Sequence, residues 1–111
     1  MAHGGDILRG HTETIILRIL SEGDSYGYEI SKSIIEGGEG VIDVKDATIY
    51  TAFKRMEEDG LLETYWGDGV GGARRRYYRI TGKGKALYVD KAEEWKKASR
   101  ILDKLILGER K

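Results

Sequence analysis

The 111-residue sequence contains no cysteine and only two histidines. The lack of cysteine excludes disulfide bonds, zinc sites with thiolate ligands and thiol catalysis. With so few imidazoles, a metal site is not expected either. No apolar run approaches the roughly 20 residues that a membrane-spanning helix needs, and the first residues lack the apolar core of a signal peptide. These absences favour a cytoplasmic protein with no cofactor and no membrane segment.

A net charge is also lacking, because nineteen cationic residues are balanced by nineteen acidic ones. A strong overall field that would attract nucleic acid is therefore not expected. The charges are nevertheless unevenly distributed. Acidic residues cluster at 57–59 and 93–94, whereas the stretch 74–85 contains six cations and no acid. A neutral chain of this kind can still present one positive face.

Hydrophobic spacing predicts four helices and one β-hairpin. Helices are expected at 12–23, 26–38, 47–60 and about 82–107, and strands at 61–66 and 74–80 around the glycine-rich turn 67–73. Ser25, Asp46 and Thr81 are expected to cap the second, third and last helices, since their side-chain oxygens can accept hydrogen bonds from free backbone N–H groups.

This order of elements predicts a winged helix-turn-helix, a mainly α fold with a small β-hairpin (α+β). In that fold the third helix enters the major groove of DNA and the hairpin is the wing. We expect a DNA-binding domain over residues 6–81 and a C-terminal dimerisation helix over residues 82–108.

The candidate DNA-binding residues lie on the third helix and the second strand. The third helix buries a stripe that includes Ile49 and Phe53, and its other side has no acid before Glu57. Base-edge contacts supply specificity and phosphate contacts supply affinity. The predicted base contacts are Thr48, Thr51 and Lys54, and the predicted contacts to the DNA backbone or minor groove are Tyr50, Arg74, Arg75, Arg76, Arg79 and Lys83.

Other functions are compatible with parts of this pattern. The arginines could form a solvated strand edge that discourages pairing with another chain. A winged helix can also serve only for protein association, but such a module would be free to expose apolar groups where this third helix has threonines and cations. An enzyme is not expected, because the sequence lacks a phosphate-binding loop with its Lys-Ser/Thr pair and any suggestion of a Ser–His–Asp triad.

The last predicted helix contains an apolar seam at heptad spacing. Its members are Tyr88, Ala92, Trp95, Ser99, Leu102 and Ile106. The first predicted helix has Ile16 on one side and Leu17 on the opposite side, so it offers a second apolar surface. Together these patterns predict a homodimer with the seam and Leu17 in its interface. Packing of the last helix on the first helix within one chain is the alternative.

Three segments resemble the PadR family of bacterial transcriptional regulators. They are YGYEI, ATIYTAFKRMEEDGLLETYW and RRRYYRIT followed by GKGK, and the resemblance extends from about residue 8 to residue 107. The resemblance implies a DNA-binding dimer, which in most members is a repressor. The family usually has proline where this chain has Thr51, and the added hydroxyl and backbone N–H are expected to alter base preference.

The short chain is similar to the compact branch of that family. In this branch, a tryptophan of the last helix stacks on flat drugs at the dimer centre, and Trp95 occupies the matching position. The resemblance therefore implies a small aromatic or cationic effector that contacts Trp95. A role of Trp95 in packing alone is the alternative.

Overall fold

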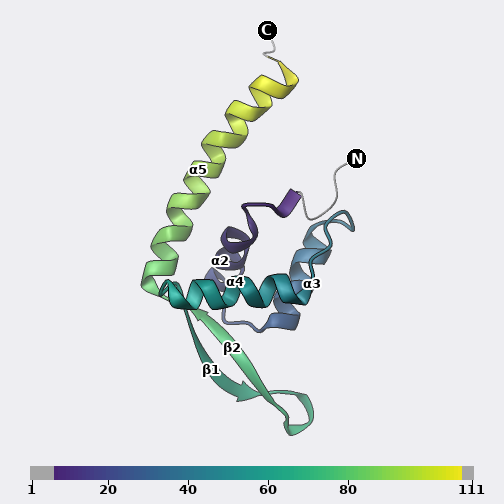
Figure 1. Cartoon of the computed structure of the whole chain (residues 1–111), viewed down its shortest axis with the longest axis vertical. Coiled ribbons are helices and arrows are strands. Elements are labelled where there is room, and N and C mark those ends of the chain that lie inside the picture. Colours follow the sequence, from purple (N-terminus) through teal and green to yellow (C-terminus); the bar gives the residue numbers. More distant parts are fainter. Residues whose placement is uncertain (1–6, 109–111) are drawn as a thin grey trace.

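The computed structural model describes residues 7–108, without the side chain of Val70. The elements are α2 (Thr12–Ser21), α3 (Gly27–Gly37), α4 (Asp46–Glu58), β1 (Leu62–Asp68), the 3-10 turn η1 (Val70–Gly72), β2 (Arg74–Ile80) and α5 (Gly82–Leu107). In Figure 1, α2, α3 and α4 form the body, the hairpin projects from it at one end, and α5 projects at the other. The structure confirms the predicted α+β fold and its order of elements; the start of the predicted first domain, residue 6, lies outside the described residues.

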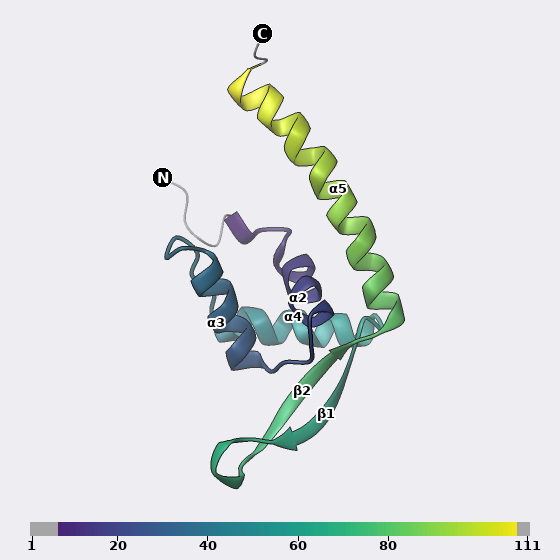
Figure 2. The ribbon, with the colours of Figure 1, turned by 180° about the vertical axis from the view of Figure 1, so that it is seen from behind.

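Helix α2 lies in the middle of the body, between α3 and α5 (Figure 2). It packs against α3, α4, β2 and α5. Leu17 is only 1% exposed and belongs to the same buried cluster as Ile16 and Leu20. The prediction that Leu17 lies on a free surface for a partner was therefore wrong, because α2 is covered on its second apolar side by elements of its own chain.

The predicted cap of the last helix is confirmed, and the caps of the two earlier helices differ from the prediction. The Gly84 N–H donates to Thr81 Oγ1 at 3.1 Å. Ser25 does not cap α3; its backbone instead forms an antiparallel bridge with Tyr78, with N–O distances of 3.2 and 2.7 Å. Tyr26 occupies the cap position of α3, and the Ser25 hydroxyl donates to Glu29 instead. Asp46 is the first residue of α4, whose cap position is occupied by Lys45 without a side-chain hydrogen bond.

The two strands of the wing are antiparallel, and alternation of side chains gives the wing two different faces. The face that we call the α4 face consists of Leu62, Thr64, Trp66, Asp68, Arg74, Arg76, Tyr78 and Ile80. The opposite face, which we call the turn face, consists of Glu63, Tyr65, Gly67, Arg75, Tyr77 and Arg79. Tyr78 is buried and its ring stacks on Phe53 of α4 with centroids 3.9 Å apart. Tyr77 points to the turn face.

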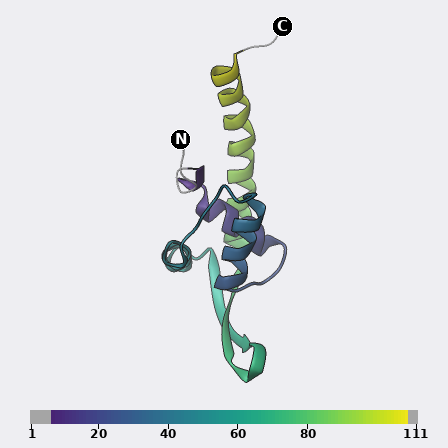
Figure 3. The same ribbon diagram turned by 90° about the vertical axis from the view of Figure 1, so that its right-hand side faces the viewer.

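Helix α5 is packed at its start and exposed at its end. Gly84 lies against the Leu61 carbonyl, where there is no room for a side chain, and Tyr88 packs on the core. The first part of the predicted seam therefore contacts its own chain, as in the alternative interpretation. Beyond it, α5 extends away from the wing into solvent (Figure 3). No helix in residues 7–108 is long and apolar enough to cross a membrane.

Candidate nucleic-acid interface

The outward ridge of α4 is polar along most of its length. Burial of Ile49, Ala52, Phe53 and Met56 turns Ala47, Thr51, Lys54 and Glu58 to the opposite side of the helix. Two of the predicted base contacts, Thr51 and Lys54, are therefore exposed on one ridge. Ala47 is exposed on the same ridge and is not among the predicted contacts, although its methyl group is of a kind that contacts thymine methyl groups. Its spacing of four residues from Thr51 was the available signal.

The structure separates the other two α4 candidates onto opposite flanks of the helix. Thr48 lines a groove of about 590 Å³ between α4, the start of α2 and Lys91 of α5. Beside it, Arg55 donates to Glu13 at 2.9 Å, which ties α4 to α2. Tyr50 instead lines a groove of about 360 Å³ between α4, the start of α3 and the wing. Thr48 thus points away from the wing and Tyr50 toward it.

The groove beside Tyr50 depends on a glycine. The Tyr50 hydroxyl lies so close to Gly27 that a Cβ atom there would overlap it. The Tyr50 ring also packs edge-on against Phe53, with centroids 5.7 Å apart. The side chain is half exposed, and its hydroxyl lies beside Gly27, the first residue of α3, in a groove that Arg75 also lines. A tyrosine hydroxyl beside a helix start and a guanidinium fits the predicted contact to a phosphate.

On the α4 face of the wing, Arg76 is held by the body and Arg74 is not. The Arg76 guanidinium forms an ion pair with Glu57 of α4 at 3.4 Å and donates to Thr64 Oγ1 at 3.3 Å. Arg74 lies nearer the tip, with its guanidinium 5.3 Å from the ring centroid of Trp66. Arg76 therefore contributes to docking of the wing, whereas Arg74 remains available to an external anion.

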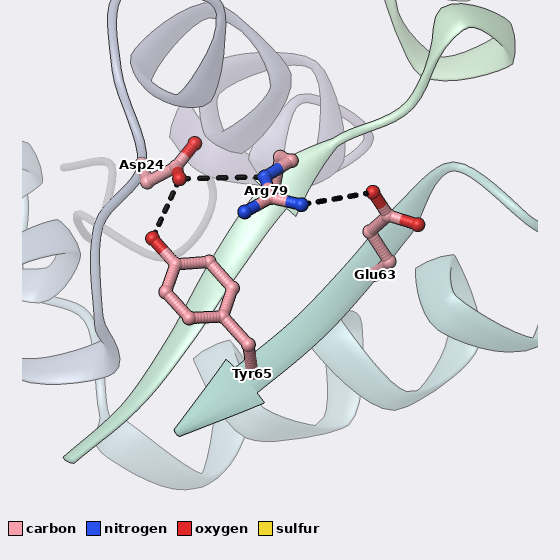
Figure 4. Close-up of polar contacts among 4 residues, drawn as sticks. All are labelled: Asp24, Glu63, Tyr65 and Arg79. Atoms are coloured by element: carbon pink, nitrogen blue, oxygen red, sulfur yellow. Dashed lines mark hydrogen bonds and ion pairs between the residues drawn. The ribbon is translucent and has the colours of Figure 1, made fainter. Parts of the chain in front are cut away.

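On the turn face, Arg79 is the centre of a polar cluster that joins the wing to the α2–α3 turn (Figure 4). Its guanidinium pairs with Asp24 at 3.5 Å and with Glu63 at 3.4 Å, and the Tyr65 hydroxyl donates to Asp24 at 2.6 Å. The hydrogen bond to Asp24 raises the pKa of Tyr65, and the bond to Glu63 raises the pKa of Arg79. A phosphate at Arg79 would have to compete with two carboxylates.

Two further cations that were predicted to contact DNA, Arg75 and Lys83, have different surroundings. The Arg75 guanidinium lies over the Tyr26 ring, 4.0 Å from its centroid. Lys83 Nζ donates to the Asp59 carbonyl at 2.7 Å, where it satisfies a free group at the end of α4. Among the residues that the structure describes, Lys54, Arg74 and Arg75 are the predicted DNA-contacting cations without a carboxylate or carbonyl partner.

Within the described range, no group of three or more His, Cys, Asp or Glu side chains could hold a metal ion. The pKa of Tyr78 is raised by burial, as is expected for a tyrosine in a core. The exposed groups instead form a polar helix ridge beside a cationic hairpin.

Comparison with known proteins agrees with this geometry. The family described as "Transcriptional regulator PadR-like family" matches residues 16–89. An uncharacterized protein of Lysinibacillus sphaericus is 43% identical over 103 residues, which cover 93% of this chain and 94% of the relative.

Solved structures are similar over nearly the whole chain. A transcriptional regulator from Clostridium thermocellum has a TM-score of 0.80 and 44% identity, covering 89% of this chain and 93% of that chain. A PadR-like transcriptional regulator from Bacillus cereus has a TM-score of 0.82 and 32% identity, covering 94% of this chain and 99% of that chain. The chain therefore belongs to the PadR-like family and is a DNA-binding transcriptional regulator with a winged helix-turn-helix fold.

Proposed function

We propose that this regulator is a cytoplasmic homodimeric repressor that binds a double-stranded operator with one α4 in the major groove of each half-site. Thr48, Thr51 and Lys54 contact base edges in this arrangement. Tyr50, Arg74 and Arg75 contact the backbone or the minor groove. Arg76, Arg79 and Lys83 act mainly by positioning the wing and the end of α4, since each already has a partner in the chain.

The exposed end of α5 is the observation that supports the dimer. Leu102 is 45% exposed, and Leu105, Ile106 and Leu107 are each more than 70% exposed. Such a run of exposed apolar side chains is typical of a surface that another chain covers. Packing of two α5 helices about a two-fold axis would bury it and hold two α4 helices at a set spacing. We propose residues 82–108 as the dimerisation element and the preceding chain as the DNA-binding domain.

Replacement of Leu102 by Asp tests the dimer. The variant would place a charge in the proposed seam, where burial without a partner is strongly unfavourable. We expect dimers of the wild type and monomers of Leu102→Asp in analytical ultracentrifugation, with helix content retained. Lys97→Asp, an exposed position outside the seam, is the control and should remain dimeric.

DNA binding is measured with duplexes selected by the wild-type protein from a random library. Leu102→Asp should bind them more than about tenfold more weakly, because the two half-sites are no longer linked. Wild-type protein that is monomeric at high micromolar concentration would contradict the dimer. A dimer that selects no duplex would instead contradict the proposal that the protein binds a double-stranded operator.

A flat aromatic or cationic effector at Trp95 is the second part of the proposal. Trp95 is 51% exposed near the middle of α5 and contacts the His11 ring edge-on, with centroids 5.1 Å apart. Two such rings about a two-fold axis could sandwich a planar compound by offset stacking. Binding would release DNA only if the compound prefers the conformation that does not bind the operator.

The effector is tested in Trp66→Phe protein, in which Trp95 is the only remaining tryptophan. A flat cationic dye should quench its emission and should weaken binding of the wild-type protein to the selected duplex. Trp95→Ala, the control, should bind the duplex with no response to the dye. A dye that changes neither signal would remove the effector from the proposal and leave the DNA-binding dimer intact.

A further inference from the structure

The α4 face of the wing changes character between its base and its tip. At the base, Leu62, Tyr78 and Ile80 are each at least 93% buried. Arg76 follows, paired with Glu57 of α4. Directly across the hairpin from Arg76, Trp66 is 58% exposed on the same face. A large aromatic side chain is thus exposed on a surface whose base packs against α4.

The chemistry at the tip fits nucleic acid better than an apolar partner. The Arg74 guanidinium lies over the Trp66 ring, and Arg74 has no ion pair among residues 7–108. Stacking on the indole orients the guanidinium while leaving its N–H groups free for acceptors. Arg76 lies directly across the hairpin from Trp66, and Asp68 lies directly across from Arg74. Arg76 is paired with Glu57, so Arg74 is the cation of this face that can meet a polyanion.

We propose that Trp66 and Arg74 together read the width and edge pattern of the DNA minor groove beside each half-site. This inference rests on the proposed docking of α4 in the major groove, which turns the α4 face of the wing toward the adjacent groove. Arginine is attracted into minor grooves that are narrowed by A·T pairs, where the negative potential is strongest. The indole packs against the sugar walls and orients Arg74, which makes Trp66 a positioning residue for the guanidinium.

The minor groove can be tested without changing the major groove. In the minor groove, a G·C pair differs from an A·T pair by the guanine amino group. Inosine lacks that amino group and keeps the major-groove edge of guanine. We would prepare three versions of the selected duplex, identical in the bases under α4, with A·T, I·C or G·C pairs in the flanks under the wing.

Wild-type protein should bind the A·T and I·C flanks about equally, and each about tenfold more tightly than the G·C flanks. Trp66→Ala should reduce this ratio to about one. Arg74→Lys should do the same with an unchanged dependence on salt, because lysine keeps the charge but not the planar stack. Arg18→Lys is the matched control, because Arg18 pairs with Glu22 on α2, outside the wing, and its variant should keep the ratio.

The outcomes separate this inference from the function on which it rests. Equal binding of the wild type to all three flanks would overturn the inference alone. A ratio that persists in Trp66→Ala and Arg74→Lys would also overturn it, and Trp66 would then serve only to pack the hairpin. If Trp66→Ala unfolds, the ratio measured with Arg74→Lys, which keeps the indole, tests the inference alone. If the wild type bound none of the duplexes, the proposed operator binding itself would be contradicted.

Discussion

The four arginines of β2 are close in sequence and differ in their surroundings. Arg76 and Arg79 form ion pairs with acids of the body or the neighbouring strand. Arg74 and Arg75 lie over aromatic rings and, among the described residues, have no carboxylate partner. The unpaired arginines are at the tip of the wing and the paired ones are toward its base. A basic run is therefore not a uniform binding patch: its base positions the wing, and its tip is available to phosphates.

The largest expected effect is the loss of DNA affinity when the two unpaired arginines are removed. Arg74→Ala/Arg75→Ala should weaken binding about tenfold per arginine, because hydrogen bonds to charged groups are lost. The slope of log affinity against log salt should fall by about two, since about one counterion is released for each neutralised phosphate.

Arg76→Ala/Arg79→Ala is the matched variant with the same change in charge. It should retain most of the salt slope and lose thermal stability, because its arginines contact protein carboxylates. Binding is measured by fluorescence anisotropy over a range of salt concentrations. If both double variants flatten the slope equally, the division between paired and unpaired arginines is wrong.

A smaller effect is expected from removal of the carboxylate that joins the wing to the α2–α3 turn. Asp24→Ala leaves both the Tyr65 hydroxyl and the Arg79 guanidinium without this acceptor. The midpoint of thermal unfolding should fall by a few degrees. Glu22→Ala breaks an ion pair of α2 in which both side chains are exposed, and it should shift the midpoint less. Equal shifts would show that the cluster contributes no more than an ordinary surface ion pair.

The smallest effect is on the titration of Tyr65, whose pKa is raised above the usual 10.0 chiefly by the hydrogen bond to Asp24. The folded state favours the protonated hydroxyl, so its stabilising contribution is complete below pH 10 and is lost as the pH rises through the folded pKa. Ultraviolet titration, with Tyr65→Phe subtracted to isolate this group, should show a lower pKa in Asp24→Ala protein. An unchanged Tyr65 titration would exclude the hydrogen bond in solution.

Helical spacing and turn residues were sufficient to predict most of the fold. The buried stripe of α4, the Thr81 cap and the two-strand wing follow from local patterns, and all are present. The prediction for Leu17 failed because periodicity shows that a side chain is apolar and does not show which element covers it. The Ser25 cap failed because a backbone bridge to Tyr78, far along the chain, competes with helix initiation.

The sequence by itself determined α4, the wing and the basic run, because these depend on side chains at short, regular spacing. Only the tertiary structure decided which cations of that run are free. Arg79 meets Asp24 across 55 residues of chain and Arg76 meets Glu57 across 19, and no local pattern encodes either pairing. Ion pairs form between groups that the packed body brings within a few ångströms. The charge that remains for DNA is therefore a property of the fold, even though every charge is visible in the sequence.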